Sequence, residues 1–297
     1  MDYKNFETIK KNIIKALFSD DELMDRLVLK GGSALDLVYA YPSGRASIDI
    51  DLSMETDFSP SALPEITTKI EKLLQNAFNE KGYQVIDFGL KPRPSKKRAG
   101  IPDFWGGYEI GFKLVSRQSY FRFQTDPRQL RMQSEILGWK MKRNFRIEIS
   151  KHEYCGEKKD YELDGYAIRV YSPAMIVAEK LRAICQQLPA YPYTGRSKRP
   201  RARDFYDIYL VQEHEPEIKW SGKEFRDLLQ KVFAAKGVEL KLLSAVERPE
   251  VRAFHSTDFP AVKATVDLKA GHHLQKFDFY FDYVTGFIAR LKAFWEK

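Results

Sequence analysis

The sequence predicts an α+β fold, with a mixed sheet crossed by helices in residues 1–170 and a mainly helical domain in residues 171–297. Two observations carry this prediction. Four strand-like runs in the first part are separated by loops rich in Pro, Gly and charge. These runs are residues 83–90, 107–116, 144–150 and 166–171. After Ser172, by contrast, apolar residues recur mainly at helical spacing to the end of the chain.

The first third of the chain alternates between helix and strand patterns. Apolar residues three to four apart predict an amphipathic helix over 6–17, and a shorter helix is expected over 33–39. Residues 48–52 read Ile-Asp-Ile-Asp-Leu, which predicts a strand with apolar side chains on one face and carboxylates on the other. A long helix is expected over 59–80, ended by Gly82.

The strongest helix signal in the second part lies at Ser172-Pro173. Ser172 is a favourable N-cap, and Pro173 fits the first helical position. Two segments stay open: residues 127–137 fit either helix or loop, and the pattern between 246 and 274 is ambiguous. The boundary between the two parts is therefore drawn at residue 170.

Composition indicates a globular, soluble and cytoplasmic protein. The chain is 43% hydrophobic and 30% charged, and it contains neither a run of about 18 apolar residues nor an apolar N-terminal segment. No membrane association is expected. Cys155 and Cys185 lie far apart without a C-x-x-C motif, which favours free thiols over a disulfide or a zinc site.

The net charge of +8 favours a polyanionic partner. Basic residues cluster at 91–98 and at 196–203, and Tyr191 and Tyr193 lie beside the second cluster. Such runs are either solvated loops or contacts to nucleic acid, and composition alone leaves both open.

The first candidate functional residues are Lys30-Gly31-Gly32-Ser33. Asp49 and Asp51 follow them after a helix-length interval. Adjacent glycines before a helix let backbone N–H groups approach an anion, and the helix N-terminus adds partial positive charge. Two carboxylates at i and i+2 of one strand point to the same side and can share Mg²⁺. Each motif alone is common in turns and on solvated strands; together they predict a site for polyphosphate and metal.

A third acid is expected on a neighbouring strand. Glu148 fits, because Ile147 and Ile149 would face the core while Glu148 faces outward. The alternative is an ordinary solvent-exposed glutamate.

A second group of charged residues lies on two helices of the C-terminal part. Lys180 and Arg182 flank Leu181 on one helix, and Asp204 and Asp207 share a face of the next. From the residues alone, an ion pair that locks the two helices together is the favoured interpretation.

These motifs resemble the AbiEii/AbiGii family of nucleotidyltransferase toxins, to which the MenT toxins belong. The resemblance covers positions 27–54 and 172–210. It implies a polymerase-beta-like nucleotidyltransferase core, an NTP substrate, Mg²⁺, and a cognate antitoxin. It also reverses the preference for a structural ion pair, because Lys180 matches a lysine implied to contact the nucleotide and Asp204 matches the aspartate of the last motif.

The residue patterns and the resemblance together give a set of expected site residues. The expected metal ligands are Asp49, Asp51 and Glu148, and the expected catalytic residues add Lys180 and Asp204. Nucleotide contacts are expected from Lys30, Gly32, Ser33, Arg45, Ser47 and Lys180. One departure concerns the interval from Ser33 to Asp49, which is longer than in minimal nucleotidyltransferases and leaves the orientation of Ser33 open.

The expected reaction is transfer of a nucleoside monophosphate to an acceptor with release of pyrophosphate. Basic charge favours RNA as the acceptor, and the resemblance suggests the 3′ end of tRNA. The alternatives are modification of a protein or of a small molecule, and a non-catalytic protein that binds RNA or a nucleotide.

Overall fold

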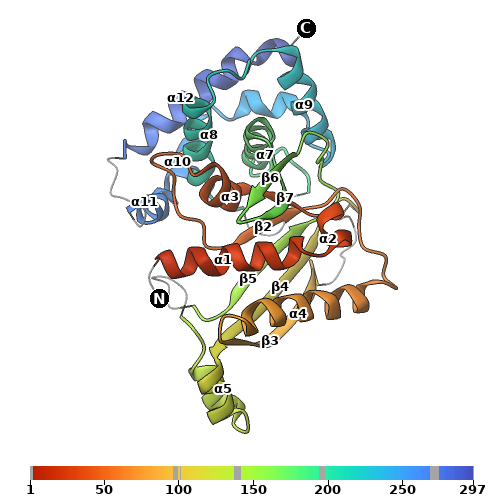
Figure 1. Ribbon diagram of the computed structural model, residues 1–297. Coiled ribbons are helices and arrows are strands. Elements are labelled where there is room, and N and C mark those ends of the chain that lie inside the picture. Colours follow the sequence, from red (N-terminus) through yellow and green to blue (C-terminus); the bar gives the residue numbers. More distant parts are fainter. Residues whose placement is uncertain are drawn as a thin grey trace.

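The computed structural model describes residues 3–95, 100, 102–136, 142–193, 198–267 and 274–296 (Figure 1). Its centre is a mixed sheet of seven strands in the order β3-β4-β5-β2-β1-β7-β6. The strands are β1 Val28–Lys30, β2 Ile50–Ser53, β3 Tyr83–Arg93, β4 Gly107–Ser116, β5 Phe145–Ser150, β6 Lys159–Leu163 and β7 Tyr166–Val170.

Parallel and antiparallel neighbours alternate near the middle of the sheet. Strand β2 runs antiparallel to β1 and parallel to β5, while β1 is parallel to β7. The outer pairs β3–β4, β4–β5 and β6–β7 are antiparallel. Central strands β1, β2 and β5 therefore lie side by side, although they come from widely separated parts of the chain.

Helices of the N-terminal part cover the sheet. Helix α1 packs against α4 and β7, and α4 packs against β3. Helices α5 and α6 contact β4, and α5 projects from the body of the molecule (Figure 1). The helical bounds are α1 Tyr3–Phe18, α2 Asp21–Arg26, α3 Gly31–Ala34, η1 Leu35–Tyr39, α4 Leu63–Asn79, α5 Arg117–Phe123 and α6 Pro127–Met132.

The described elements after β7 are all helical. Helix α7 packs against α8 and α9, and α8 also contacts α11 and α12 (Figure 1). The bounds are α7 Pro173–Cys185, α8 Ala202–His214, α9 Lys223–Ala234, η2 Leu240–Ala245, α10 Pro249–Ser256, α11 Phe259–Asp267, α12 Phe277–Arg290 and η3 Lys292–Phe294. As predicted, Ser172 caps α7, with its hydroxyl accepting from Met175 N at 3.3 Å.

One buried hydrophobic cluster includes side chains from both parts of the chain, from Phe6 on α1 to Leu291 after α12. The α+β fold class with a mixed sheet is confirmed. Division into two domains at residue 170 stays a prediction. Within the described ranges, no helix combines the length and apolar character that crossing a bilayer requires. Cys155 and Cys185 are both free and buried.

The long helix expected from residue 59 begins at Leu63, and the structure differs from the expected elements in four further places. The helix expected over 33–39 is a short α-turn followed by a π-helix, and β2 begins at Ile50, so Asp49 precedes the strand. Strands β1 and β6 were not expected. Their sequences, Val-Leu-Lys and Lys-Asp-Tyr-Glu-Leu, are too short or too polar for periodicity to distinguish them.

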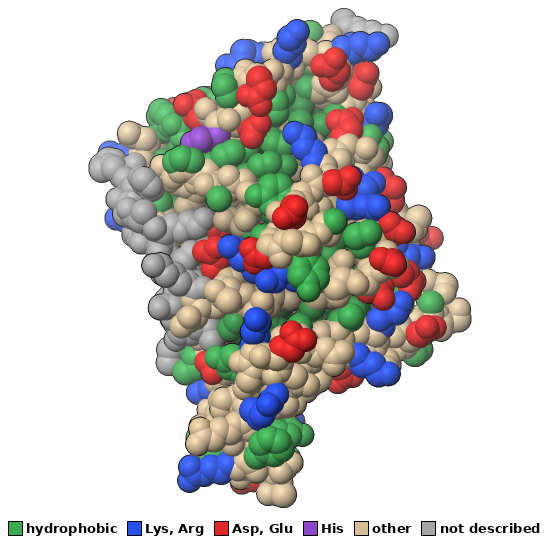
Figure 2. All heavy atoms as spheres, viewed as in Figure 1, with side chains coloured by type: hydrophobic (Ala, Val, Ile, Leu, Met, Phe, Trp, Pro, Cys, Tyr) green, Lys and Arg blue, Asp and Glu red, His purple; other side chains and the backbone are tan. Residues whose placement is uncertain are grey.

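On the face in Figure 2, acidic and basic side chains are interspersed.

Candidate active site

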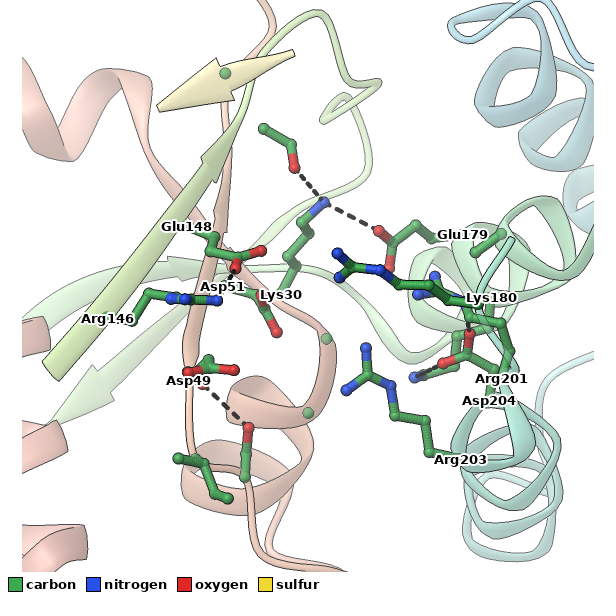
Figure 3. A pocket seen from close by; sticks show the side chains of 18 of the residues that line it. Lys30, Asp49, Asp51, Arg146, Glu148, Glu179, Lys180, Arg201, Arg203 and Asp204 are labelled. Carbon is green, nitrogen blue, oxygen red and sulfur yellow. Dashed lines mark hydrogen bonds and ion pairs between the residues drawn. The ribbon is translucent and has the colours of Figure 1, made fainter. Parts of the chain in front are cut away.

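A cleft of about 830 Å³ lies between the sheet and the helices α7 and α8. Its sheet wall carries Asp49, Asp51 and Glu148, and its helical wall carries Glu179 and Lys180 (Figure 3). Three arginines near the start of α8 complete the helical wall: Arg199, Arg201 and Arg203. The cleft therefore joins residues from the two sequence segments that carry the predicted motifs.

The turn after β1 depends on its two glycines. Gly31 has φ +61°, where a side chain is strained, and Asp51 Oδ2 lies 3.1 Å from the point that a Cβ on Gly31 would occupy. A Cβ on Gly32 would lie 2.9 Å from Arg45 Nη2 and 3.0 Å from Ser47 Oγ. Gly31 and Gly32 thus allow Arg45, Ser47 and Asp51 to pack directly against the backbone at the start of α3.

Four charged residues form a row across the neighbouring strands. Lys30 pairs with Asp51, Asp51 with Glu148, and Glu148 with Glu109. Because paired residues on adjacent strands share a face, all four side chains lie on the cleft side of the sheet. The predicted proximity of Glu148 to Asp51 is present in the structure, although Glu148 also receives a hydrogen bond from Arg146 at 3.3 Å.

Asp51 lies in an environment that disfavours its charge. Burial raises the pKa of Asp51 to about 6, and the neighbouring Glu148 and Asp49 act in the same direction against Lys30 and Arg203. The positive charges of Lys30 and Arg203 do not offset burial and the two neighbouring carboxylates, and a bound cation would add the missing compensation.

Asp49 is held through its backbone. The Ser33 hydroxyl donates to the Asp49 carbonyl at 2.6 Å, and the Ser47 hydroxyl donates to the same oxygen at 3.1 Å. Ser33 is fully buried. Its side chain therefore orients the Asp49 backbone, and Ser33 is not among the residues that line the cleft, so its expected phosphate contact stays a prediction.

The backbone of the same loop is fixed again at Ser47. The buried Lys10 on α1 pairs with Asp36, and Lys10 Nζ also donates to Ser47 O at 2.7 Å. Asp36 Oδ2 accepts from Ser47 N at 3.1 Å. A lysine on the apolar face of the predicted first helix was the available signal for this contact, and it was missed.

Lys30 reaches away from the Gly-Gly turn toward α7. Its Nζ lies 3.0 Å from Glu179 Oε1 and 3.1 Å from Ser150 Oγ, with Glu153 at 3.7 Å. Burial opposes the charge, but Glu179 and Glu153 raise the pKa of Lys30 above its usual value. Lys30 thus joins the sheet to α7, and its expected nucleotide contact stays a prediction.

Glu153 lies at the centre of this buried cluster. Arg182 donates to it at 2.8 Å, and Lys236 lies 3.4 Å from it. Although burial acts to raise it, Arg182, Lys30 and Lys236 lower the pKa of Glu153 to about 2. Sequence patterns gave no signal for Glu153 or Lys236, because neither belongs to a motif.

Lys180 makes the ion pairs that the residues alone suggested. Its Nζ lies 3.0 Å from Asp204 Oδ1 and 2.6 Å from Asp207 Oδ2. Arg45 binds Asp207 through two hydrogen bonds, of 2.9 and 2.7 Å. The network therefore spans the cleft from the loop before β2 to helix α8, and Lys180 both lines the cleft and holds its walls together.

Cations stabilise the two aspartates of this network. Burial acts to raise both pKa values, but Arg201 and Lys180 hold the pKa of Asp204 well below its usual range. In the same way, Arg45 and Lys180 lower the pKa of Asp207. Both carboxylates are therefore negatively charged at neutral pH.

Arg203, like Arg199, differs from the ion-paired Lys180 and Arg201 of the helical wall. It is exposed, and among the described residues no carboxylate lies within ion-pair distance of it. Its side chain points into the space between the two walls (Figure 3). Residues 96–98 and 196–197 of the predicted basic clusters lie outside the described residues, whereas Arg199, Arg201 and Arg203 line the cleft.

The donor set on the sheet wall suits a hard cation. Asp51 and the neighbouring Glu148 offer only carboxylate oxygens, which Mg²⁺ prefers. Within the described ranges, no group of three or more His, Cys, Asp or Glu forms a preassembled metal site. The fit to a cation therefore rests on the carboxylate chemistry alone. Asp49, Asp51 and Glu148 stay the predicted ligands.

A family model described as nucleotidyl transferase AbiEii toxin, type IV toxin–antitoxin system, matches residues 12–283. The chain belongs to the AbiEii family. AbiEii membership makes the protein a nucleotidyltransferase and confirms the resemblance inferred from its motifs. As an AbiEii toxin, it transfers a nucleoside monophosphate taken from an NTP.

Solved structures also resemble this AbiEii protein, at low sequence identity. JHP933 from Helicobacter pylori is 16% identical with a TM-score of 0.46, and the match covers 98% of this chain and 92% of the other. MenT4, a nucleotidyltransferase toxin from Mycobacterium tuberculosis, is 15% identical with a TM-score of 0.48, covering 97% and 82%. No curated protein matches the chain significantly.

Proposed function

We propose that the protein transfers a nucleoside monophosphate from an NTP to the 3′ end of an RNA, with tRNA as the acceptor and Mg²⁺ as the cofactor. One observation carries the proposal: the carboxylates of Asp49, Asp51 and Glu148 lie across a single cleft from Lys180, Arg201 and Arg203. The carboxylates suit metal ions, and the cations suit the triphosphate.

In this mechanism, the backbone at Gly32, which lines the cleft at the start of α3, holds the triphosphate. Asp49 and Asp51 hold Mg²⁺, assisted by Glu148. Bound Mg²⁺ would neutralise charge on the triphosphate. Arg203 and Lys180 add positive charge from the opposite wall, and Arg45 and Ser47 fix the loop that carries Asp49.

The transfer itself exchanges one phosphorus–oxygen bond for another. The acceptor hydroxyl oxygen attacks the α-phosphorus, and the bond from that phosphorus to the bridging oxygen breaks, so pyrophosphate leaves with the electron pair. Glu148 accepts the hydroxyl proton, a role supported by its place beside Asp51 and by its partly exposed carboxylate. Asp204 holds Lys180 in place at 3.0 Å.

The charge of +8 supports RNA as the acceptor, and an RNA of this class would be met in the cytoplasm. Family membership also supports a cognate antitoxin. A neighbouring gene that encodes a small DNA-binding protein would support that partner.

The deciding experiment incubates the protein with each labelled NTP, Mg²⁺ and total RNA. Label in the tRNA band, removed by a 3′ exonuclease, is the expected result. Label that appears on protein or on a small molecule instead would overturn RNA as the acceptor. Loss of label on addition of EDTA, and its return with Mg²⁺, would support the metal assignment.

A further inference from the structure

Trp105 lies between two cavities. It lines the main cleft, and it also lines a second cavity of about 340 Å³ that shares Arg93, Gly107 and Tyr108 with the first. The second cavity is bounded further by Pro92, Pro94, Lys151 and His152, among others. A ligand in the cleft can therefore continue past Trp105 into a neighbouring space.

The indole of Trp105 is anchored by its N–H edge. Trp105 Nε1 donates to the Tyr191 hydroxyl at 3.1 Å, and that hydroxyl donates to Lys236 O at 2.9 Å. Tyr191 is almost fully buried. Because the partner is buried and itself fixed, the ring plane of Trp105 is set before any ligand arrives.

Trp105 is half-buried, packs partly against the hydrophobic core, and lines both cavities. Tyr108, the other aromatic residue of the described cleft lining, packs against Phe58 at 5.5 Å and donates its hydroxyl to Asp57. Among the described residues, no aromatic ring is stacked on Trp105. An anchored indole without a ring partner is the side chain that binds a nucleobase by stacking.

The order of the strands indicates whether Trp105 lies on the side of the NTP or on the side of the acceptor. The Gly-Gly turn follows β1, the carboxylates lie on β5 and at β2, and Trp105 precedes β4. The carboxylates thus separate the phosphate-binding turn from Trp105. In phosphoryl transfer the attacking and leaving oxygens lie roughly in line, so the acceptor approaches from the side opposite the pyrophosphate.

We infer that Trp105 stacks on the terminal base of a single-stranded RNA acceptor, and that the second cavity receives the preceding nucleotide. Arg93 and Lys151 lie there, Arg93 paired with Glu109 and Lys151 with Asp57, so the phosphate of that nucleotide would exchange with these carboxylate partners. This inference rests on the proposed function, since it requires that the acceptor be a nucleic acid. It assigns to Trp105 a binding role on the acceptor side of the reaction.

The test measures steady-state transfer to a short single-stranded oligoribonucleotide by wild type, Trp105→Ala and Trp105→Phe. We expect the KM for the oligonucleotide to rise about tenfold or more in Trp105→Ala and less in Trp105→Phe, which keeps an aromatic face. The KM for the NTP stays within about twofold. Trp295→Phe is the matched control, because Trp295 Nε1 bonds to Ser244 Oγ and the residue lies outside both cavities.

A second readout does not depend on turnover. Titration with the oligonucleotide should quench tryptophan fluorescence in wild type and in Trp295→Phe, and the quenching should be lost in Trp105→Phe. If the melting temperature of Trp105→Ala shows that this variant folds poorly, the fluorescence measurement still tests the role of Trp105.

The outcomes separate the inference from the proposed function. If wild type labels RNA and Trp105→Ala keeps its KM for the oligonucleotide, the stacking role is wrong while the proposed function stands. A raised KM for the NTP alone would assign Trp105 to the nucleotide substrate and overturn the inference. If wild type labels protein and never RNA, both fail.

Discussion

Asp51 lies between Lys30 on one neighbouring strand and Glu148 on the other. Its side chain is therefore part of the cleft and contributes little to the hydrophobic core. Lys180 is different, because the same nitrogen that faces the cleft also pairs with two buried aspartates. The two residues thus lead to different expectations for stability.

Asp51→Asn should abolish transfer while the melting temperature stays unchanged or rises. The amide keeps the shape but removes the charge that holds a metal ion, and it relieves repulsion from Glu148 and Asp49. Asp49→Asn should also abolish transfer. The assay is label transfer together with thermal unfolding, and full activity in either variant would contradict the assignment of the carboxylates.

Lys180→Ala should lower both stability and activity. Removing the cation leaves Asp204 and Asp207 buried with less compensation, a change that costs about 3–5 kcal/mol for a buried pair. Activity should fall further than the folded fraction, because the cleft also loses a charge near the triphosphate.

Urea unfolding gives the folded fraction, and transfer is then expressed per folded molecule. Lys180→Arg is the control that keeps the charge without the compact ammonium. Normal activity per folded molecule in Lys180→Ala would assign the residue a structural role alone.

The loop before β2 illustrates how separate elements fix one short segment. Helix α1 contributes Lys10, helix α3 contributes Ser33, and α8 contributes Asp207 through Arg45. The loop itself has no regular secondary structure, so these contacts determine where Asp49 lies.

The double variant Lys10→Met, Asp36→Leu separates loop positioning from burial of charge. Lys10→Met alone leaves Asp36 buried without its cation and should be strongly destabilising. The double variant should recover much of that stability, because no unpaired charge remains. Its kcat should nevertheless stay low, since both hydrogen bonds to the Ser47 backbone are lost. Recovery of kcat along with stability would show that the pair does not position the loop.

The contact between His255 on α10 and Arg201, the residue before α8, makes the stability of the protein sensitive to pH. His255 is buried and accepts a hydrogen bond from Arg201 N at 2.9 Å, and burial lowers its pKa to about 4 from 6.5. Because the unfolded chain binds this proton more readily, stability is lost as the pH falls from about 6.5 toward 4.

The expected loss through His255 is about 2 kcal/mol between pH 7 and pH 5. Urea unfolding of wild type and His255→Gln at both pH values measures it as a difference, which cancels the titration of other groups. An equal pH dependence in the two proteins would contradict the contribution of His255.

Periodicity predicted the elements that have a long amphipathic pattern, such as α1, α4, β4 and α7, because their burial follows a repeat visible in the sequence. It did not predict β1, which has only three residues and is stabilised by pairing on both sides. The predicted site residues line the cleft, except Ser33, which is fully buried. The motifs did not predict that Ser33 and Lys30 would bond within the protein, because hydrogen-bond direction depends on contacts between distant segments.

At the scale of the whole molecule, the hydrophobic core runs without interruption from the sheet into the helices. Helix α7 is central to this continuity, since most of its residues are buried and it contacts both α8 and α9. The predicted boundary at residue 170 thus separates two kinds of secondary structure within a shared core.

We therefore expect both parts to unfold in one cooperative transition. Differential scanning calorimetry should give a single peak, with a calorimetric enthalpy equal to the van't Hoff enthalpy. Two resolved transitions, or a stable fragment 1–170 after limited proteolysis, would show instead that the sheet part folds independently of the helices.

The bidentate pairing of Arg45 with Asp207 has a genetic consequence. Cells that express a toxin select for survivors that have inactivated it, and a change at Arg45 would be recovered because it leaves Asp207 with less compensation. Removing the charge of Asp207 as well, as in the double variant Arg45→Gln, Asp207→Asn, should restore part of the toxicity. Second-site changes that restore toxicity to an Arg45 variant, found by replica plating with and without induction, should therefore arise at position 207, more than 150 residues away in the sequence.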